Sequence, residues 1–361
     1  MPALPQSKFA QLSELIRERI ETGEWTDKLP SERILADEFL VSRTTLRRAL
    51  EILTRDGLIE APSARCTLRA IRKSKARRTA PTHREVCFLT PTLHVSPLLT
   101  EQIATMRGLF TQAGIKVASE ESASLVDRRD PSAHLRRIVA RHPDAMWVLH
   151  KMPESVQRWF QANGLPTVIF GSAFPEVSLP SVDVDFRAAA HHAAGLCLAR
   201  GCRRIGLLIH RTPLAGDEKT VSAVSAVLTR QGSPAPKVMR HDSNRARLMD
   251  ALDREFLDNP DACDALIVAN HHHLLTVQSH LLHRGIRLPE QLSLVYLSND
   301  PSAERLSPLP LRYESGPALI RRLVAAVKTL AEGGNPPSSS IIPKLLDGQT
   351  MRRATGPEKD Q

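Results

Sequence analysis

Near the start of the chain, apolar positions recur at helical spacing in three segments. The first has them at i, i+3, i+7 and i+11, as Phe9, Leu12, Ile16 and Ile20. One apolar face of this kind predicts a helix, which we expect to end near Gly23. Ser31 is a suitable N-cap residue for a second helix. The apolar side of this second helix is predicted to consist of Ile34, Leu35 and Phe39.

The third segment begins at Ser42, a second N-cap candidate, and its helix is expected to reach about Asp56, with Gly57 as the stop. Its positions i, i+3, i+4 and i+7 predict a buried face of Leu46, Ala49, Leu50 and Leu53. The opposite side carries a strip of basic and hydroxyl residues, Arg43, Thr44, Arg47 and Arg48. Residues 58–71, "LIEAPSARCTLRAI", follow and predict two short strands around a turn.

A helix with a packed back and an Arg/Thr strip suits the major groove of DNA. Arginine bonds a guanine edge through two donors, threonine contacts a thymine methyl, and a helix N-terminus favours phosphate. A basic strip alone is more often a solvated face. The preceding helix, the short turn and the hairpin favour DNA contact here.

From about Glu85 onward, short apolar strands alternate with amphipathic helices. The strand candidates are residues 86–89, 115–118, 145–150, 166–170, 181–185, 204–209, 265–269 and 292–297. This alternation predicts an α/β fold with parallel sheets and helices on both faces. Eight or more strands over this length favour two lobes rather than one wide sheet. Residues 72–84, "RKSKARRTAPTHR", are basic and almost without apolar residues, so we interpret them as a linker, either a solvated hinge or a phosphate contact.

Composition and charge distribution support this division. The chain has 361 residues, 42% hydrophobic and 24% charged, with a formal net charge of +10. Residues 1–84 hold 17 Lys and Arg against 11 Asp and Glu, so this first quarter carries more than half of the excess. A short basic module on a nearly neutral body is typical of a nucleic-acid reader joined to another domain. Five scattered cysteines without CxxC spacing and the lack of a long apolar run favour a cytoplasmic protein with reduced thiols.

Residues 8–71 resemble the winged helix-turn-helix of the GntR family, whose core reads roughly P-S-E-R-x-L-A, V-S-R-x-T-[VL]-R-x-A-L and G-L-I. The matching positions are Pro30-Ser31-Glu32-Arg33, Leu35-Ala36, Val41-Ser42-Arg43, Thr45, Leu46-Arg47, Ala49-Leu50, Leu53 and Gly57-Leu58-Ile59. The resemblance implies double-stranded operator DNA as partner. With the basic strip, the expected DNA-contacting set is Arg33, Ser42, Arg43, Thr44, Thr45, Arg47 and, from the wing tip, Arg65.

Two positions depart from that family. Its turn usually has Gly where this chain has Leu40. A left-handed Leu costs about 1–2 kcal/mol, so a rearranged turn is expected. The wing tip usually reads Gly-basic-Gly-Thr, whereas residues 64–67 here read Ala-Arg-Cys-Thr, which keeps Arg65 and loses both glycines. A stiffer wing is expected to sit differently over the minor groove.

Residues 85–347 resemble the LacI/periplasmic-binding-protein fold, through residues 181–208, 265–297 and 332–346. That fold implies a small-molecule effector between two lobes, at the carboxyl ends of strands. Loop residues at those ends form the expected effector-binding set: His94, Ser96, His150, Asp185, Lys219, Asn270 and Ser298. Asp185 is equally suited to cap the helix that follows it, and His150 to be a surface imidazole.

Several positions differ from sugar-binding members of that fold family. They usually have Asn-Asp where this chain has Asn270-His271, Arg at the position of Thr220, and Asp at the position of Ser298. Aromatic residues, which commonly stack on sugars, make up only 4% of the chain. The resemblance therefore implies a sugar or a related, altered metabolite, or a pair of lobes kept mainly for dimerisation.

The predicted domains are a winged helix-turn-helix at 1–71, a basic linker at 72–84, an effector-binding and dimerisation domain at 85–350 and a disordered tail at 351–361. We expect a homodimeric transcriptional regulator, a repressor, and neither a cofactor nor a bound metal, since three consecutive histidines on a helix point about 100° apart. The sequence shows no catalytic motif of the common hydrolase or nucleotide-binding types. The alternatives are a cytosolic binding protein or enzyme with an incidental basic N-terminus, and a regulator without an effector.

Overall fold

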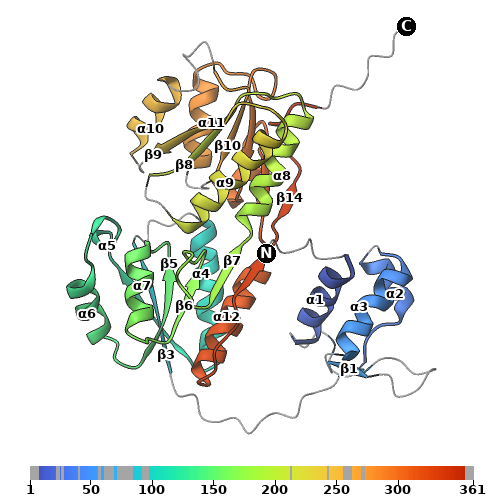
Figure 1. The fold of residues 1–361 in the computed structure, drawn as a ribbon, viewed down its shortest axis with the longest axis vertical. Coiled ribbons are helices and arrows are strands. Elements are labelled where there is room, and N and C mark those ends of the chain that lie inside the picture. Colours follow the sequence, from blue (N-terminus) through green and yellow to red (C-terminus); the bar gives the residue numbers. More distant parts are fainter. Residues whose placement is uncertain are drawn as a thin grey trace. The chain divides into compact units, whose positions relative to one another are not determined.

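A computed structural model describes most of the chain in two compact units, residues 1–79 and 80–361. The described residues are 8–21, 25, 28–39, 41–55, 58–60, 69–70, 84–91, 97–211, 214–241, 244–254, 262–269 and 273–353. Figure 1 shows their helices and strands. Leu40, Arg65, the linker up to residue 83 and the end of the chain from residue 354 lie outside them, so the expectations about these positions stay untested.

The described residues of the first unit form three helices and one pair of antiparallel strands. Its helices are α1 (Lys8–Glu21), α2 (Glu32–Glu38) and α3 (Arg43–Arg55). Strand β1 (Ile59–Glu60) pairs with β2 (Arg69–Ala70) in antiparallel register. The predicted helices and the two predicted strands are therefore confirmed.

Periodicity and capping explain these helices. The predicted buried face of α3 is confirmed, since Leu46, Ala49, Leu50 and Leu53 are all buried. They pack with Leu12 and Ile16 of α1 and with Leu35 in one apolar core. Ser42 caps α3, because its hydroxyl accepts a hydrogen bond from the Thr45 amide at 3.1 Å. Ser31 accepts likewise from the Ile34 amide at 3.4 Å.

The expectation that Ile34 lies on the apolar side of α2 was wrong. Its side chain is 52% exposed, whereas the neighbouring Leu35 is fully buried. Consecutive residues on a helix point about 100° apart, so a helix of seven residues that buries Leu35 and Ala36 turns Ile34 outward.

The described residues of the second unit form two six-stranded sheets. The two separate sheets confirm the prediction of two lobes rather than one wide sheet. The first has the order β13-β7-β6-β5-β3-β4 and the second the order β14-β12-β11-β10-β8-β9. All pairs are parallel except β12 with β14 at the edge of the second sheet. The strands of the first sheet are β3 (Glu85–Thr90), β4 (Lys116–Glu121), β5 (Ala145–His150), β6 (Thr167–Phe170), β7 (Ser181–Val184) and β13 (Ser339–Ile341). Those of the second are β8 (Ile205–His210), β9 (Lys237–His241), β10 (Ala265–Val268), β11 (Ser293–Tyr296), β12 (Leu311–Glu314) and β14 (Lys344–Leu346).

Helices cover these sheets and fill the intervals between strands (Figure 1). They are α4 (Pro97–Gln112), α5 (Ser124–Asp127), α6 (Ser132–Ala140), α7 (Glu154–Ala162), α8 (Phe186–Ala199), α9 (Ala215–Arg230), α10 (Arg245–Leu252), α11 (Leu274–His283), the 3-10 turn η3 (Pro301–Arg305) and α12 (Ala318–Ala331). None of the helices in the described part of the chain is long and apolar enough to cross a membrane.

The chain passes between the two sheets three times. It leaves the first after β7, returns after β12 so that α12 packs on the first sheet, and leaves again between β13 and β14. We call each sheet with its helices a lobe. Three crossing segments place the ends of β7 and β12 and the start of α8 at the boundary between the lobes, where a cavity lies.

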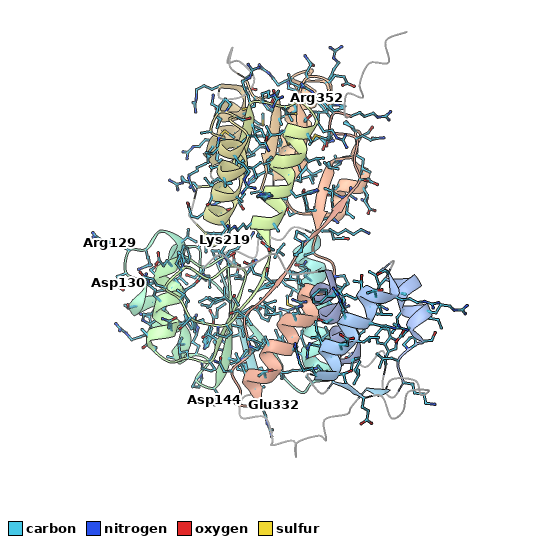
Figure 2. The ribbon with its side chains drawn as sticks, turned by 45° about the vertical axis from the view of Figure 1, so that its right-hand side comes forward. Arg129, Asp130, Asp144, Lys219, Glu332 and Arg352 are labelled. Carbon is cyan, nitrogen blue, oxygen red and sulfur yellow. The ribbon has the colours of Figure 1, made fainter. Side chains whose placement is uncertain are left out.

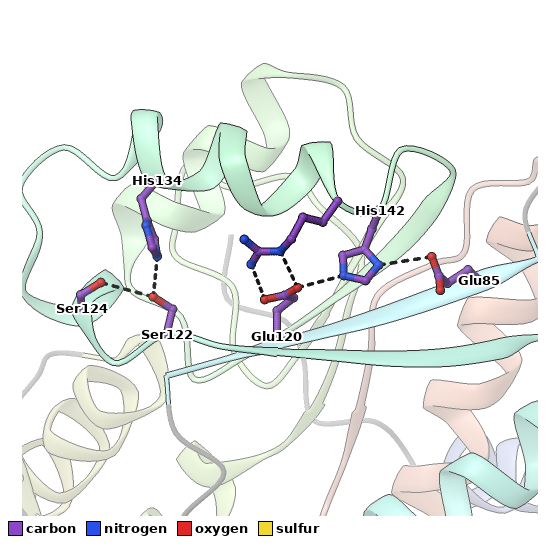
Figure 3. Close-up of polar contacts among 7 residues, drawn as sticks. Glu85, Glu120, Ser122, Ser124, His134 and His142 are labelled. Carbon is purple, nitrogen blue, oxygen red and sulfur yellow. Dashed lines mark hydrogen bonds and ion pairs between the residues drawn. The ribbon is translucent and has the colours of Figure 1, made fainter.

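A polar network fastens β3, β4 and the end of α6 in the first lobe (Figure 3). The His142 ring lies between the carboxylates of Glu85 and Glu120, at 3.3 Å and 2.9 Å. Arg141 Nε donates to Glu120 at 3.0 Å, and the hydrogen bonds from this guanidinium hold the pKa of Glu120 below its ordinary value. The network is satisfied within the lobe, so it serves the packing of the edge strand.

The predicted boundary between the second domain and a disordered tail, at residue 351, lies too early in the chain. The Met351 side chain is buried in the core of the second lobe. Arg352 donates to the carbonyls of Pro289, Glu290 and Gln291 at 3.3, 3.2 and 3.0 Å. The second lobe therefore extends at least through Arg352, whose polar character hid this anchoring from the composition of the segment.

Candidate functional site

The exposed side of α3 carries the predicted basic strip. Arg43, Thr44, Arg47 and Arg48 are all exposed, opposite the buried leucines of the same helix. Arg33 is exposed on α2, and neither Arg33 nor Arg43 forms an ion pair with another described residue. The strip thus presents guanidinium donors to solvent, as a surface for phosphates and base edges requires.

Other residues of the basic strip and of the predicted DNA-contacting set have partners within the unit. Arg47 Nε donates to Glu32 Oε2 at 2.9 Å, and the Ser42 and Thr45 hydroxyls lie 2.9 Å apart. The Arg48 guanidinium lies over the Phe9 ring, 5.8 Å from its centroid. These contacts orient the side chains along the face of α3 before any DNA is bound.

The second unit contains a cavity of about 480 Å³ between its lobes. Its lining comes from the carboxyl ends of strands in both sheets, from the first turns of α8 and α9 and from the segment before α12. This is the position expected for a ligand in an open α/β fold, and the volume suits a small organic molecule.

The structure places some predicted effector residues at this cavity and not others. His150 and Ser298 line it. Asp185 does not, since its carboxylate caps α8 by accepting from the Ala188 amide at 2.9 Å, which is the alternative left open from the sequence. Lys219 lies beside the cavity (Figure 2), with Nζ 3.7 Å from Asp183 Oδ2. His94, Ser96 and Asn270 are outside the described residues.

Four charged residues that line the cavity were absent from the predicted effector-binding set: Lys151, Asp183, Asp217 and Glu314. Burial lowers the pKa of Lys151 to about 8 and raises that of Asp217 to about 6. Burial also raises the pKa of Asp183, which accepts hydrogen bonds from the Ser172 hydroxyl and the Val184 amide. The sequence contained two signals for these cavity residues. Asp183 is a charged residue inside an otherwise apolar strand, and Lys151 directly follows the strand at 145–150.

The backbone at Lys151 supports a functional role for this end of β5. Its φ of 53° is the one positive φ of a non-glycine residue among those the structure describes. Residues other than glycine rarely adopt this backbone conformation, and those that do cluster at ligand-binding sites.

Two matches to family models cover different parts of the chain. Residues 8–68 match the model "Bacterial regulatory proteins, gntR family", and residues 194–351 match "Periplasmic binding protein-like domain". The chain therefore joins a GntR-family helix-turn-helix domain to a periplasmic-binding-protein-like domain, as the resemblances implied.

Curated relatives match short stretches of this chain. The Exu regulon transcriptional regulator of Escherichia coli K12 is 45% identical over 58 residues, 16% of this chain and 22% of the relative. The uncharacterised HTH-type transcriptional regulator YdfD of Bacillus subtilis is 44% identical over 70 residues, 19% of this chain and 14% of the relative. The chain thus aligns with less than a quarter of the length of either protein.

Solved structures resemble this chain in fold over about three quarters of its length. A LacI family regulator from Bifidobacterium animalis has a TM-score of 0.64 at 15% identity, covering 75% of this chain and 99% of that one. The transcription regulator GntR from Chromobacterium violaceum has a TM-score of 0.62 at 19% identity, and the match covers 76% of this chain and 100% of that chain. At such identities the likeness shows the fold alone. That fold has two lobes, each built on a mostly parallel sheet, as in the LacI family structures.

Proposed function

We propose that this chain is a sequence-specific DNA-binding transcriptional regulator, a repressor, whose operator affinity is modulated by a small molecule bound between its lobes. The observation that carries the proposal is the exposed basic strip on α3, whose opposite face is buried in the core of the unit. This domain matches the gntR family model. The curated relatives named above are transcriptional regulators by their own descriptions, which supports the same function.

In this proposal α3 enters the major groove and its arginines contact bases and phosphates. The contacting set is the one predicted from the sequence: Arg33, Ser42, Arg43, Thr44, Thr45, Arg47 and Arg65. Two copies in a homodimer read a palindromic operator, with half-sites about one helical turn apart. Because its partner is chromosomal DNA, the protein acts in the cytoplasm.

The cavity between the lobes supports modulation by an effector. A ligand that binds the closed arrangement of the lobes better than the open one shifts the population towards it. In a dimer this changes the spacing of the two helix-turn-helix domains and hence operator affinity, a coupling of typically about 1–3 kcal/mol. The regulatory domain spans residues 85–353 in this proposal, and 72–84 link it to the DNA-binding domain.

The test begins with selection of duplexes from a random pool by the full chain. We expect enrichment of a palindrome, whose affinity falls with salt by a slope of about −0.9 per phosphate neutralised. Arg43→Ala should weaken binding at least tenfold, whereas Arg137→Ala, which removes an exposed arginine of the second unit, should leave it unchanged. Failure to enrich any sequence, or affinity indifferent to both salt and Arg43→Ala, contradicts the proposal.

A further inference from the structure

Most polar side chains around the interlobe cavity are already engaged within the protein. Gln157 donates to the carbonyls of Met152 and Ser172, and its oxygen accepts from the Phe174 amide. The Thr220 hydroxyl donates to the Gly216 carbonyl at 2.8 Å. Donor hydrogens used in this way are not available to the several hydroxyl groups of a sugar.

Two buried oxygens at the cavity remain without a hydrogen-bond partner among the described residues. They are Asp217 Oδ2, in the first turn of α9, and Ser298 Oγ, just after β11. A buried acceptor without a donor costs free energy, more so when it belongs to a carboxylate. Asp217 is only 7% exposed, so a ligand in the cavity is the natural source of the missing donor.

The charges around the cavity also favour a cationic ligand. Its lining holds three carboxylates, Asp183, Asp217 and Glu314, against one lysine, Lys151. Asp183 is balanced by Lys219 at 3.7 Å, and the Glu314 carboxylate accepts from the Asn299 amide group at 3.0 Å. With Lys219 counted, one negative charge remains in excess, and Asp217 is the carboxylate with the unused oxygen.

The rest of the lining is mainly apolar. Phe170 comes from the end of β6, Phe186 from the start of α8, and Leu319 and Ile320 from the first turn of α12. Neither Trp147, which is buried in the first lobe's core, nor Trp159 reaches the cavity. The surroundings therefore suit a hydrocarbon body with one strongly polar end.

We propose that the effector class of this cavity is a primary amine on an apolar body, whose ammonium group donates to Asp217 Oδ2 and Ser298 Oγ. This inference rests on the proposed function of the cavity as an effector site. The apolar body lies against Phe170, Phe186 and the first turn of α12. An N–H donor is required to satisfy these oxygens, because a quaternary ammonium offers its positive charge but no hydrogen bond.

The experiment measures thermal stabilisation of the full chain by matched compounds. Phenethylamine, tryptamine and hexylamine are each compared with the alcohol of the same skeleton and with the N,N,N-trimethyl derivative. We expect the amines to raise the melting temperature, in proportion to ln(1 + [L]/Kd), and the alcohols and trimethyl compounds to do so far less. If none of the amines stabilises the protein more than its alcohol does, the inference is overturned.

Variants of two cavity carboxylates separate the role of Asp217 from general charge. Asp217→Asn removes the charge with little change of shape and should weaken amine binding by about 10- to 100-fold. Glu314→Gln removes a carboxylate of the same cavity whose oxygen is already engaged, and should change the affinity by less than about threefold. Equal effects of the two variants, or none from Asp217→Asn, overturn the proposal.

The pH profile gives a readout that a purely structural Asp217 would not produce. The charged groups that act on Asp217 are Lys151 across the cavity, Arg240 of β9 and the adjacent Glu218, and the last two pair with each other at 2.8 Å. Since burial places the pKa of Asp217 at about 6 and that of Lys151 at about 8, amine affinity should rise from acid to mildly alkaline pH. An alkyl amine, with a pKa of about 10.4, stays charged throughout.

The two proposals fail in different ways. If xylose or another sugar stabilises the protein and amines do not, the amine inference is wrong while an effector-modulated regulator stands. If amines bind through Asp217 but the chain enriches no DNA sequence, the ligand class stands and the proposed regulator is wrong. Operator binding measured with and without the amine then decides whether the two sites are coupled.

Discussion

Arg47 of α3 donates a hydrogen bond to Glu32 of α2 at 2.9 Å, so one arginine of the predicted DNA-contacting face is held by an acid. Both side chains are exposed by more than a third, and such pairs contribute about 0–1 kcal/mol. Glu32→Gln should therefore change the free energy of unfolding by less than about 1 kcal/mol while it frees Arg47 and removes a negative charge near the phosphates.

The expected result is tighter DNA binding by several-fold at low salt, with the difference narrowing as salt increases. Fluorescence anisotropy with a labelled duplex measures it, and urea denaturation checks stability. Glu51→Gln, on the exposed side of the same helix one turn from its end, is the control for the loss of a charge elsewhere. Weaker binding by Glu32→Gln would mean that the pair positions Arg47 rather than restrains it.

The packed back of α3 gives a prediction that separates folding from recognition. Leu53 is fully buried in the core of the first unit, whereas Leu15 of α1 is 49% exposed. Leu53→Ala should destabilise the first unit by about 2–5 kcal/mol and abolish DNA binding, while Leu15→Ala should stay within about 0.5 kcal/mol of the wild type. Chemical denaturation and the same anisotropy assay measure both. Amine binding between the lobes should survive both variants, and its loss in Leu53→Ala would show that the two units do not fold separately.

The described helices of the first unit could be predicted from the sequence, because the information that specifies them is local. The spacing of Leu46, Ala49, Leu50 and Leu53 and the capping serine Ser42 define α3 without reference to the rest of the chain. Ile34 was the exception, since a helix of seven residues has too few turns for its apolar side to be assigned from spacing alone.

The second unit was predictable in class but not in its cavity. The eight predicted strands correspond to β3 to β8, β10 and β11. All of them except the edge strand β4 are inner strands of their sheets, where residues buried on both faces make largely apolar runs. Strands β9, β12, β13 and β14 were missed: each is short and polar in part, as in "KVMRH" at Lys237–His241. Asp183 and Asp217 were missed because only the three crossings between lobes bring the end of β7 and the start of α9 together.

Burial of Asp217 predicts a stability that depends on pH. Burial raises the pKa of this carboxyl from 3.8 to about 6, so the folded chain binds its proton more tightly than the unfolded chain does. The stability gained from this proton is fully present below pH 3.8, the pKa of the carboxyl in the unfolded chain, and it is lost as the pH rises through about 6. At neutral pH the charged, desolvated carboxylate therefore costs on the order of 2 kcal/mol in the unliganded protein.

Asp217→Asn should therefore stabilise the unliganded protein by about 1–3 kcal/mol near neutral pH, and by much less in acid. Urea denaturation at several pH values measures the difference. Asp250→Asn, at an exposed position of α10, should change stability by less than about 0.5 kcal/mol at every pH. If Asp217→Asn instead destabilised the protein at neutral pH, the hypothesis that Asp217 lowers the stability of the unliganded protein and serves a ligand would be contradicted.

The anchored end of the second lobe gives a last prediction. The Arg352 guanidinium donates to three backbone carbonyls in the segment between α11 and β11, and its amide donates to Ser293 Oγ at 3.3 Å. Arg352→Ala leaves those carbonyls without this charged donor and should cost about 1–3 kcal/mol of the free energy of unfolding. Arg353→Ala removes the same side chain from an exposed position one residue further and should cost less than about 0.5 kcal/mol. Urea denaturation of both variants measures the difference, and equal stabilities would show that residues after Thr350 contribute only through the buried Met351 side chain.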